Sequence, residues 1–195
     1  MRRAESYARR PPRREPYDSV LIVCEGGKSE PNYLARLREV RRLSNTNIRI
    51  LPSEGTDPMS VVTFAESLAA RDRYDRVFCV FDRDEHATYN AAVQRVAGLP
   101  RFYAITSWPC FEIWILLHFV YSAAPRNRGG AFDEVRKHYP TYTKGCKTVY
   151  DDLANQLEPA LRHANRLMAE NNKSGATNPA TKMHELVLYL IGLKS

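Results

Sequence analysis

The sequence lacks a hydrophobic run long enough to cross a membrane, and its first residues lack the pattern expected of a secretory leader. Its most apolar window, Ile113–Leu117, extends to Tyr121 only by including His118, whereas a membrane span needs about 20 apolar residues. The basic N-terminus is not followed by an apolar run before Val20, so we expect no signal peptide. These absences predict a cytoplasmic protein without a membrane partner.

Closely spaced cysteines and a nucleotide-binding P-loop are also missing. The cysteines stand at positions 24, 79, 110 and 146 and form no Cys-x-x-Cys pair, which argues against a zinc ribbon and for reduced cytosolic thiols. The run Gly27-Lys28-Ser29 has the end of a Walker loop, but such a loop needs a glycine where Ile22 stands. A P-loop is therefore excluded.

The charge of the chain is concentrated at its start. The 195 residues are 44% hydrophobic and 26% charged, which is typical of a globular protein rather than of a disordered or coiled-coil chain. The net charge is +7, and six arginines lie within the first 14 residues. We interpret residues 1–17 as a disordered basic arm. Such an arm suits a polyanionic partner, because phosphate neutralisation releases counterions, and it equally suits a solubilising role.

Short apolar runs alternate with helical patterns along the first two thirds of the chain. Runs of this kind are typical of strands buried in a parallel sheet, and Asp57-Pro58 predicts the start of a helix. The alternation predicts an α/β fold with a mostly parallel, four-stranded, Rossmann-like sheet flanked by helices. The four predicted strands are Val20–Cys24, Ile48–Pro52, Val77–Phe81 and Phe102–Ile105.

The expected organisation has three parts. After the arm, residues 18–121 form the α/β core, which ends with a strongly apolar helix over 109–121. Residues 122–195 are predicted as a helical extension packed on the core, and its last helix is expected to start at Asn178-Pro179. Pattern alone gives neither the position of the extension nor the oligomeric state.

Carboxylates follow two of the predicted strands. Glu25 comes directly after the first strand, and Asp82 and Asp84 follow the third. Ligands collect beyond the carboxyl ends of parallel strands, so these side chains meet if the two strands are neighbours. Crowded carboxylates repel unless a cation compensates them, and hard oxygen ligands suit Mg²⁺ or Mn²⁺. The alternative is that these acids are turn formers in a solvated loop.

Three further side chains near these strands carry candidate chemistry. Lys28 and Ser29 stand where a glycine turn enters a helix, a place that can hold a phosphate; a helix cap and a solvated lysine are the alternative. Glu112 lies in an apolar segment, where a carboxylate is costly unless it is paired or bound. The alternative for Glu112 is a solvent-facing position or a pair with an arginine.

Two lysines of the extension stand among aromatic residues. Lys144 and Lys182 are interleaved with several tyrosines, and aromatics among cations suit single-stranded nucleic acid through stacking and phosphate contact. The alternative is a solvated helical face with partly buried tyrosines.

The strand-end motifs resemble a known domain. Glu25 in VCEGGKSEPNY, together with Asp82 and Asp84 in VFDRDEH, resembles the Toprim pattern of topoisomerases, DnaG-type primases, and OLD-family and RecR-like proteins. A fuller set of motifs, covering 18–190, resembles the RloB-like (AbiLii-like) family of bacterial restriction and abortive-infection loci. These motifs are VLIVCEGGKSEPNYL, VFCVFDRDEH, SWPCFEIWILLHF, YTKG and NPATKMH.

The resemblance implies Mg²⁺-dependent phosphodiester chemistry, with Asp82 and Asp84 as metal ligands and Glu25 as a ligand or a general acid/base. It places Glu112 near the site as a further acid and makes Lys144 and Lys182 candidates for substrate binding. The implied protein is a nuclease acting on DNA or RNA, tRNA included, as an antiphage or restriction-associated effector.

The same resemblance implies a partner. Defence effectors of this kind are restrained or triggered by an ABC/AAA-type ATPase, which would be a separate polypeptide because this chain has no Walker loop. The alternative is a non-catalytic Toprim-like module that binds nucleic acid or a partner ATPase.

Overall fold

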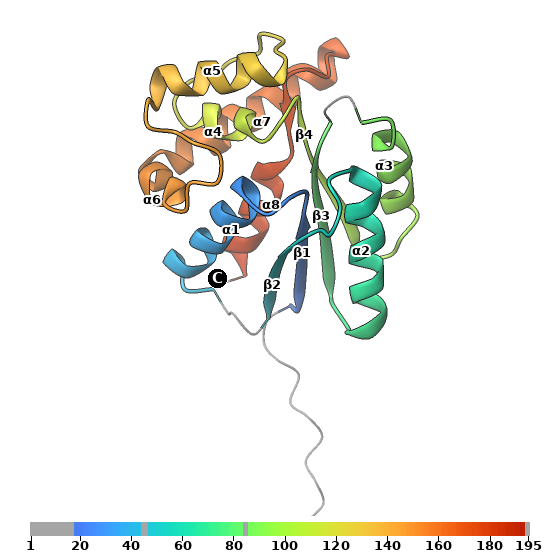
Figure 1. Cartoon of the computed structure of the whole chain (residues 1–195). Helices are drawn as coiled ribbons and strands as arrows, with labels where there is room; N and C mark the ends of the chain where they lie inside the picture. Colours follow the sequence, from blue (N-terminus) through green and yellow to red (C-terminus); the bar gives the residue numbers. More distant parts are fainter. Residues whose placement is uncertain (1–17, 44–46, 84–85, 194–195) are drawn as a thin grey trace, which may run out of the picture.

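In the computed structural model, the described residues are 18–43, 47–83 and 86–193. The arm predicted for residues 1–17 and the carboxylate of Asp84 lie outside them. The centre of the fold is a sheet with the strand order β2-β1-β3-β4-β5 (Figure 1). Its strands are β1 (Val20–Cys24), β2 (Ile48–Pro52), β3 (Arg76–Asp82), β4 (Phe102–Trp108) and β5 (Ala180–Thr181).

The prediction of a mostly parallel sheet flanked by helices is confirmed, and the predicted number of strands is wrong. β1 to β4 pair in parallel, whereas β5 adds an antiparallel fifth strand beside Ser107 and Trp108. β5 has only two residues, too few to leave a periodic signal. Because β5 occupies this stretch, the last helix starts at Met183 and not at Asn178-Pro179 as predicted. The side chain of Asn178 instead forms hydrogen bonds with the backbone amide and carbonyl of Arg126.

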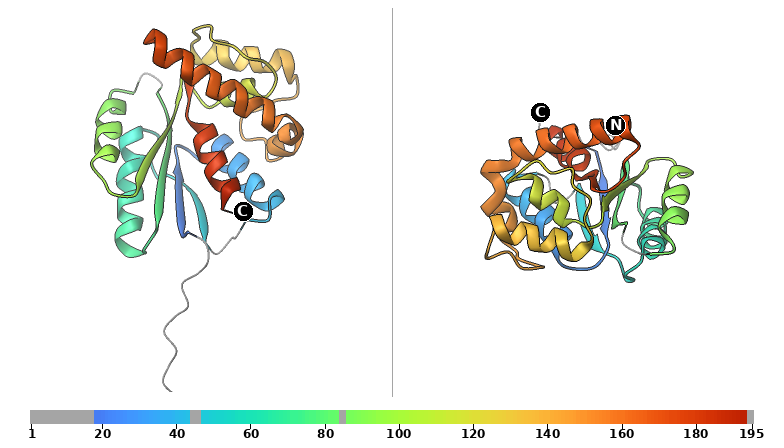
Figure 2. Two further views of the ribbon diagram at one scale, coloured as in Figure 1. Left: turned by 180° about the vertical axis from the view of Figure 1, so that it is seen from behind. Right: turned by 90° about the horizontal axis from the view of Figure 1, so that it is seen from above.

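Helices cover both faces of the sheet. α2 and α3 lie on one face, and α1, α4, α7 and α8 lie on the other (Figures 1 and 2). Asp57 caps α2 as predicted, accepting bonds from the amides of Met59 and Ser60. The helices are α1 (Ser29–Val40), α2 (Pro58–Arg71), α3 (Tyr89–Ala97), α4 (Glu112–Leu117), α5 (Arg128–His138), α6 (Val149–Leu153), α7 (Leu157–Ser174) and α8 (Met183–Gly192).

Burial on both faces explains the continuous apolar run of β1. Val20 and Ile22 point to the α1 and α8 side, while Leu21 and Val23 point to the α2 side. All five residues of β1 are fully buried. A strand with a core on each side has no solvated face, so it shows no polar alternation.

The helices after Tyr121 share the core of the α1 side. Tyr33 of α1 makes edge-on ring contacts with Phe111 and Trp114, at centroid distances of 5.8 and 6.3 Å, and with Tyr150 of α6 at 5.3 Å. Buried residues of α5, α7 and α8 belong to the same hydrophobic cluster. These contacts hold the later helices against the sheet and fix what they present to its carboxyl edge.

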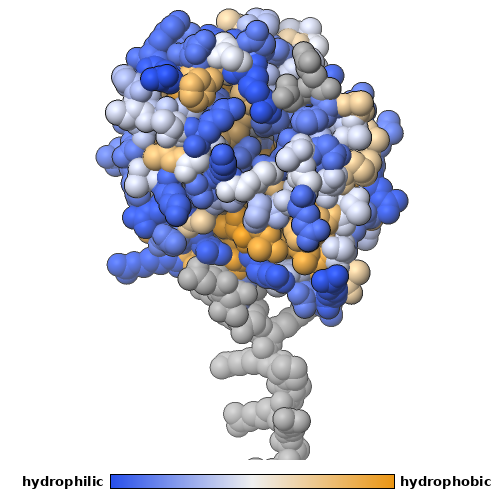
Figure 3. All heavy atoms as spheres, in the orientation of Figure 1, coloured by the Kyte–Doolittle hydropathy of each residue, from blue (hydrophilic) through white to orange (hydrophobic). Residues whose placement is uncertain are grey.

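The open edge of the sheet at β2 is visible as hydrophobic surface. On the face drawn in Figure 3, hydrophobic residues gather over β1 and β2 between α1 and α2. Ile50 and Leu51 are only partly buried there, while Arg49 is exposed. A charged residue and the proline that ends β2, Pro52, discourage pairing with another chain at this edge. Within the described part of the chain, no helix has the length and apolar character of a membrane span.

Acid should destabilise the fold through His118. This side chain is 2% exposed, its Nδ1 lies 2.9 Å from the carbonyl oxygen of Trp114, and burial lowers its pKa to about 4. Below pH 6.5 the His118 imidazole is protonated in the unfolded chain but stays neutral in the folded chain. The free energy of unfolding therefore falls as the pH falls toward 4. Between pH 7 and 5 this costs about 2 kcal/mol.

Urea unfolding at the two pH values measures this cost. In His118→Gln the loss between pH 7 and 5 should shrink by about 2 kcal/mol. An equal pH dependence in the wild type and the variant would show that His118 does not control it.

Candidate functional site

Glu25 and Asp82 meet where the strand order of the sheet reverses. β1 lies between β2 and β3, and a crevice beyond the carboxyl ends of such strands is where α/β sheets bind ligands. Glu25 follows β1 directly, and its amide donates a hydrogen bond of 2.8 Å to the carbonyl of Val80. The carboxylate of Glu25 in turn accepts a 3.1 Å bond from the amide of Asp82. Adjacent parallel strands thus bring together two acids 57 positions apart.

These two acids open into a cavity of about 400 Å³ above the carboxyl edge of the sheet. Both signs of charge line the cavity. Its charged lining residues are the four acids Glu25, Glu30, Asp82 and Glu112 and the three cations Lys28, Arg128 and Lys144. A cavity of this composition can hold a cation on its acids and an anionic group on its basic residues.

The acids of the cavity are crowded and poorly hydrated. The pKa of Glu30 is raised to about 7, mainly by burial and also by the nearby charges of Glu112 and Glu25, while a backbone hydrogen bond and Arg128 oppose the rise. Burial also raises the pKa of Asp82 well above its usual range, with repulsion from Glu30 as the next cause and Arg128 opposing the rise. Carboxylates held this close are costly to ionise together unless cations compensate them.

Basic and polar groups partly compensate the acids. Arg128, at the start of α5, lies 3.2 Å from Asp82, and Lys144 lies 3.8 Å from Glu112. Glu112 is 3% exposed and also accepts a 3.3 Å bond from the hydroxyl of Tyr142. It is therefore a buried, paired acid within the site and not a solvent-facing one.

The loop that carries Lys144 is fixed against the glycine turn after β1. The amide of Gly145 donates a 3.2 Å bond to the hydroxyl of Ser29, and its carbonyl accepts a 2.7 Å bond from Asn32. Ser29 therefore holds this loop and does not cap α1, whose N-cap is Lys28 without a side-chain bond. The contact joins sequence motifs 116 positions apart.

Gly145 should resist substitution because of its backbone and its neighbour. Its φ is +83°, and an added Cβ would stand 3.3 Å from the Cβ of Lys28. We expect Gly145→Ala to lower the free energy of unfolding by about 1–2 kcal/mol through left-handed strain alone, and by more through the contact. Urea unfolding measures the loss.

The matched control is Gly175→Ala. Gly175 has a φ of +74° with open space around its Cβ position, so it reports the backbone strain without a contact. Equal losses at Gly175 and Gly145 would show that the loop is not tightly packed on Lys28.

The structure assembles most of the predicted site residues and adds two. Lys182 does not line this cavity; it precedes α8 and lines two other cavities. Glu30 and Arg128 belong to the cavity and were not predicted. Glu30 had a signal, because it is a second acid shortly after β1, in the first turn of α1. Arg128 had none, since it stands in a loop-like APRNRGGA segment far along the chain.

The donor atoms of the cavity fit a hard divalent cation by their chemistry. Glu25 and Asp82 offer carboxylate oxygens, which Mg²⁺ and Mn²⁺ prefer, and a cation between them would relieve the crowding of the acids. Within residues 18–43, 47–83 and 86–193, no group of three or more His, Cys, Asp or Glu side chains is arranged to hold a metal ion.

Comparison with known proteins identifies a family. A family model described as RloB-like protein matches residues 20–190, which include every strand of the sheet and every residue of the cavity. No curated protein and no solved structure matches the chain.

Proposed function

The chain belongs to the RloB-like protein family, and on that premise we propose that its acidic cavity is the active site of a nuclease. The enzyme would hydrolyse phosphodiester bonds in DNA or RNA, tRNA included, with Mg²⁺ or Mn²⁺ as cofactor. The observation that carries the proposal is the meeting of Glu25 and Asp82 in one cavity with Arg128 and Lys144. The order of the acids along the sequence, with Asp84 two positions after Asp82, supports a Toprim-type site.

The proposed roles follow from the charges of the cavity. Glu25 and Asp82, with Asp84, would hold the metal. When bound, the metal polarises a phosphoryl oxygen and lowers the pKa of a water molecule. Arg128 and Lys144 would neutralise the phosphodiester.

The remaining polar residues of the cavity complete the proposed site. Lys28 would contact the phosphate at the entrance of α1, and Ser29 would keep the Lys144 loop in place through Gly145. Glu30 and Glu112 are left to accept or donate a proton.

The biological setting of the proposal rests on the family resemblance. We propose a cytoplasmic effector of antiphage, abortive-infection or restriction-associated defence. An ABC/AAA-type ATPase would restrain or trigger it. This ATPase would be a separate polypeptide, because the sequence has no Walker loop of its own.

A non-catalytic module that binds nucleic acid or the ATPase is the second candidate. Two observations favour it. The described residues offer no three-ligand cluster, and Arg128 already neutralises Asp82. In this alternative the acids would bind a basic partner or a metal without chemistry.

A cleavage assay separates the two candidates. The purified full chain is incubated with single-stranded and duplex DNA, with RNA and with tRNA, in Mg²⁺, Mn²⁺ or EDTA, with and without a candidate partner ATPase of the ABC/AAA type. Metal-dependent cleavage of any substrate, abolished by EDTA, supports the nuclease. Binding without cleavage under every condition supports the module.

A further inference from the structure

Two arginines at opposite ends of β3, Arg76 at its start and Arg83 directly after it, each lie close to two aromatic rings. The guanidinium of Arg83 lies 3.5 Å from the ring centroid of Trp108 and 5.2 Å from that of Tyr89. At the other end of the same strands, Arg76 lies 5.1 Å from Tyr103 and 4.8 Å from Tyr189. We call each arginine with its two aromatic rings an arginine pair. The Arg83 pair and the Arg76 pair have the same chemistry at different positions, so each can serve as the control for the other.

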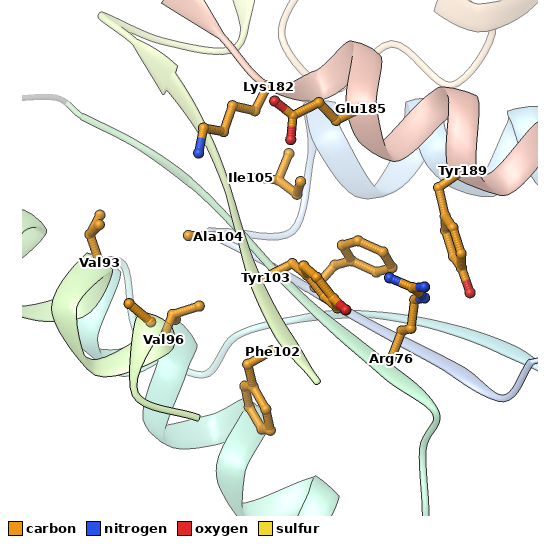
Figure 4. A pocket seen from close by; sticks show the side chains of 12 residues that line it. Arg76, Val93, Val96, Phe102, Tyr103, Ala104, Ile105, Lys182, Glu185 and Tyr189 are labelled. Atoms are coloured by element: carbon orange, nitrogen blue, oxygen red, sulfur yellow. The ribbon is translucent and has the colours of Figure 1, made fainter. Parts of the chain in front are cut away.

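The Arg76 pair is balanced by acids. Asp18 lies 3.7 Å from Arg76, and Glu185 lines the same cavity of about 420 Å³. Figure 4 shows Arg76 beside the ring of Tyr103, with Tyr189 on the neighbouring helix. This cavity lies along β4 toward the amino ends of β3 and β4, away from the acidic cavity.

The Arg83 pair lines a cavity of different charge. This cavity of about 220 Å³ lies between β4, β5 and the C-terminal half of α7. Two cations, Arg83 and Lys182, line it, and none of its described lining residues is acidic. Leu167 and Met168 make part of its wall apolar, and Asn172 adds a polar lining residue.

The two cavities lie on opposite sides of the carboxyl end of β3. Successive residues of a strand point to opposite faces of the sheet. Asp82 therefore points toward Arg128 and the acidic cavity, while Arg83, the next residue, points toward Trp108 and Tyr89. A single strand of nucleic acid that crosses the carboxyl edge of the sheet can contact both cavities.

We propose that the cavity of Arg83, Trp108 and Lys182 binds a nucleotide of single-stranded nucleic acid next to the phosphodiester held in the acidic cavity. The base stacks on the Arg83–Trp108 pair, its edge faces the amide of Asn172, and Lys182 contacts the phosphate. Stacked aromatic and guanidinium planes recognise unpaired bases in this way. The assignment rests on the proposed function for the neighbouring phosphodiester.

Binding to short oligonucleotides in EDTA tests the site without cleavage. The chain has two tryptophans, of which Trp114 is fully buried, so a stacking base should quench the emission of Trp108. We expect a single-stranded oligonucleotide to quench the tryptophan emission of the wild type and to leave the emission of Trp108→Phe nearly unchanged. In fluorescence anisotropy, Arg83→Ala should weaken binding about tenfold or more.

The controls separate stacking from charge. Arg76→Ala removes the same charge from the matched pair and should leave the affinity within about twofold of the wild type. An oligonucleotide with abasic sites keeps its phosphates but has no base to stack. It should therefore bind the wild type about as weakly as the normal oligonucleotide binds Arg83→Ala.

The proposal is overturned if the abasic oligonucleotide binds like the normal one, if duplex DNA binds equally well, or if Arg76→Ala weakens binding as much as Arg83→Ala. It is also overturned if a free mononucleotide binds as tightly as the oligonucleotide, which would indicate a site for free nucleotides. These outcomes do not depend on cleavage. If the enzyme cleaves nucleic acid but its binding does not depend on bases, the proposed function stands and this inference fails. If binding depends on bases but no cleavage occurs, the base-binding site stands and the proposed nuclease activity fails.

Discussion

Glu25→Gln and Asp82→Asn should each lower the rate of nucleic-acid cleavage by at least about 10³-fold. Each replacement keeps the shape of the side chain and removes the negative charge that would hold the metal. Glu25 also accepts the amide hydrogen bond of Asp82, so an amide oxygen at position 25 preserves the backbone contact while weakening metal binding. The measurement is a single-turnover cleavage assay in Mg²⁺ on the substrate that the wild type cleaves.

A matched acid outside the cavity controls for general effects of charge. Glu158 is exposed on α7 and does not line the cavity, so Glu158→Gln should cleave like the wild type. Thermal melts check folding, and we expect both cavity variants to melt near the wild type because each loses a crowded carboxylate. Cleavage that persists at wild-type rates in Glu25→Gln and Asp82→Asn would place the chemistry elsewhere or in a contaminant.

Trp114→Ala should lower the free energy of unfolding by about 3–5 kcal/mol. Trp114 is fully buried in α4, and its ring meets His118 edge-on at 4.7 Å and Tyr33 at 6.3 Å. α4 packs against α5 and α7, so the cavity left by the indole opens at the contact between the sheet and the later helices. Urea unfolding followed by circular dichroism measures the loss.

An exposed aromatic residue provides the reference for this loss. Tyr103 is 39% exposed, and we expect Tyr103→Ala to cost about 1 kcal/mol or less. A loss below about 1 kcal/mol in Trp114→Ala would mean that α4 contributes little to the core. It would also mean that the later helices are held by other contacts.

The pairing of Glu25 with Asp82 could be predicted because it depends on strands with strong local signals. Val20–Cys24 and the end of β3 are continuous apolar runs, and the acids that follow them stand at the same edge of any parallel sheet. What the pattern left open was whether the two strands are neighbours. That depends on the strand order, which the packing of helices on both faces decides.

Lys28 and Lys144 were candidates from the sequence, whereas Arg128, the third cation of the cavity, could not be predicted because a later helix carries it. Arg128 reaches Asp82 from a position 46 residues further on, through the packing of α5 on α4. Lys144 arrives because Gly145 fits against Lys28 and Ser29. No local pattern encodes such a contact between distant segments.

Lys182 shows the opposite difficulty. Its place among the motifs of the family made it a candidate for the same site, and the two-residue strand β5 instead ties its amide to the carbonyl of Thr106. The side chain therefore lines cavities along β4. The apolar helix predicted over 109–121 is present but shorter, because α4 spans only Glu112–Leu117. Two-residue β5 is too short to be found by periodicity. Both elements determine what surrounds the carboxyl edge of the sheet.

The most direct test of the central claim is a titration of the full chain with Mn²⁺, followed by electron paramagnetic resonance. If the acids after β1 and β3 form a divalent-cation site, the wild type will remove the signal of free Mn²⁺, and a variant carrying both Glu25→Gln and Asp82→Asn will leave it. An unchanged signal with the wild type, or equal uptake of Mn²⁺ by both proteins, would contradict the account.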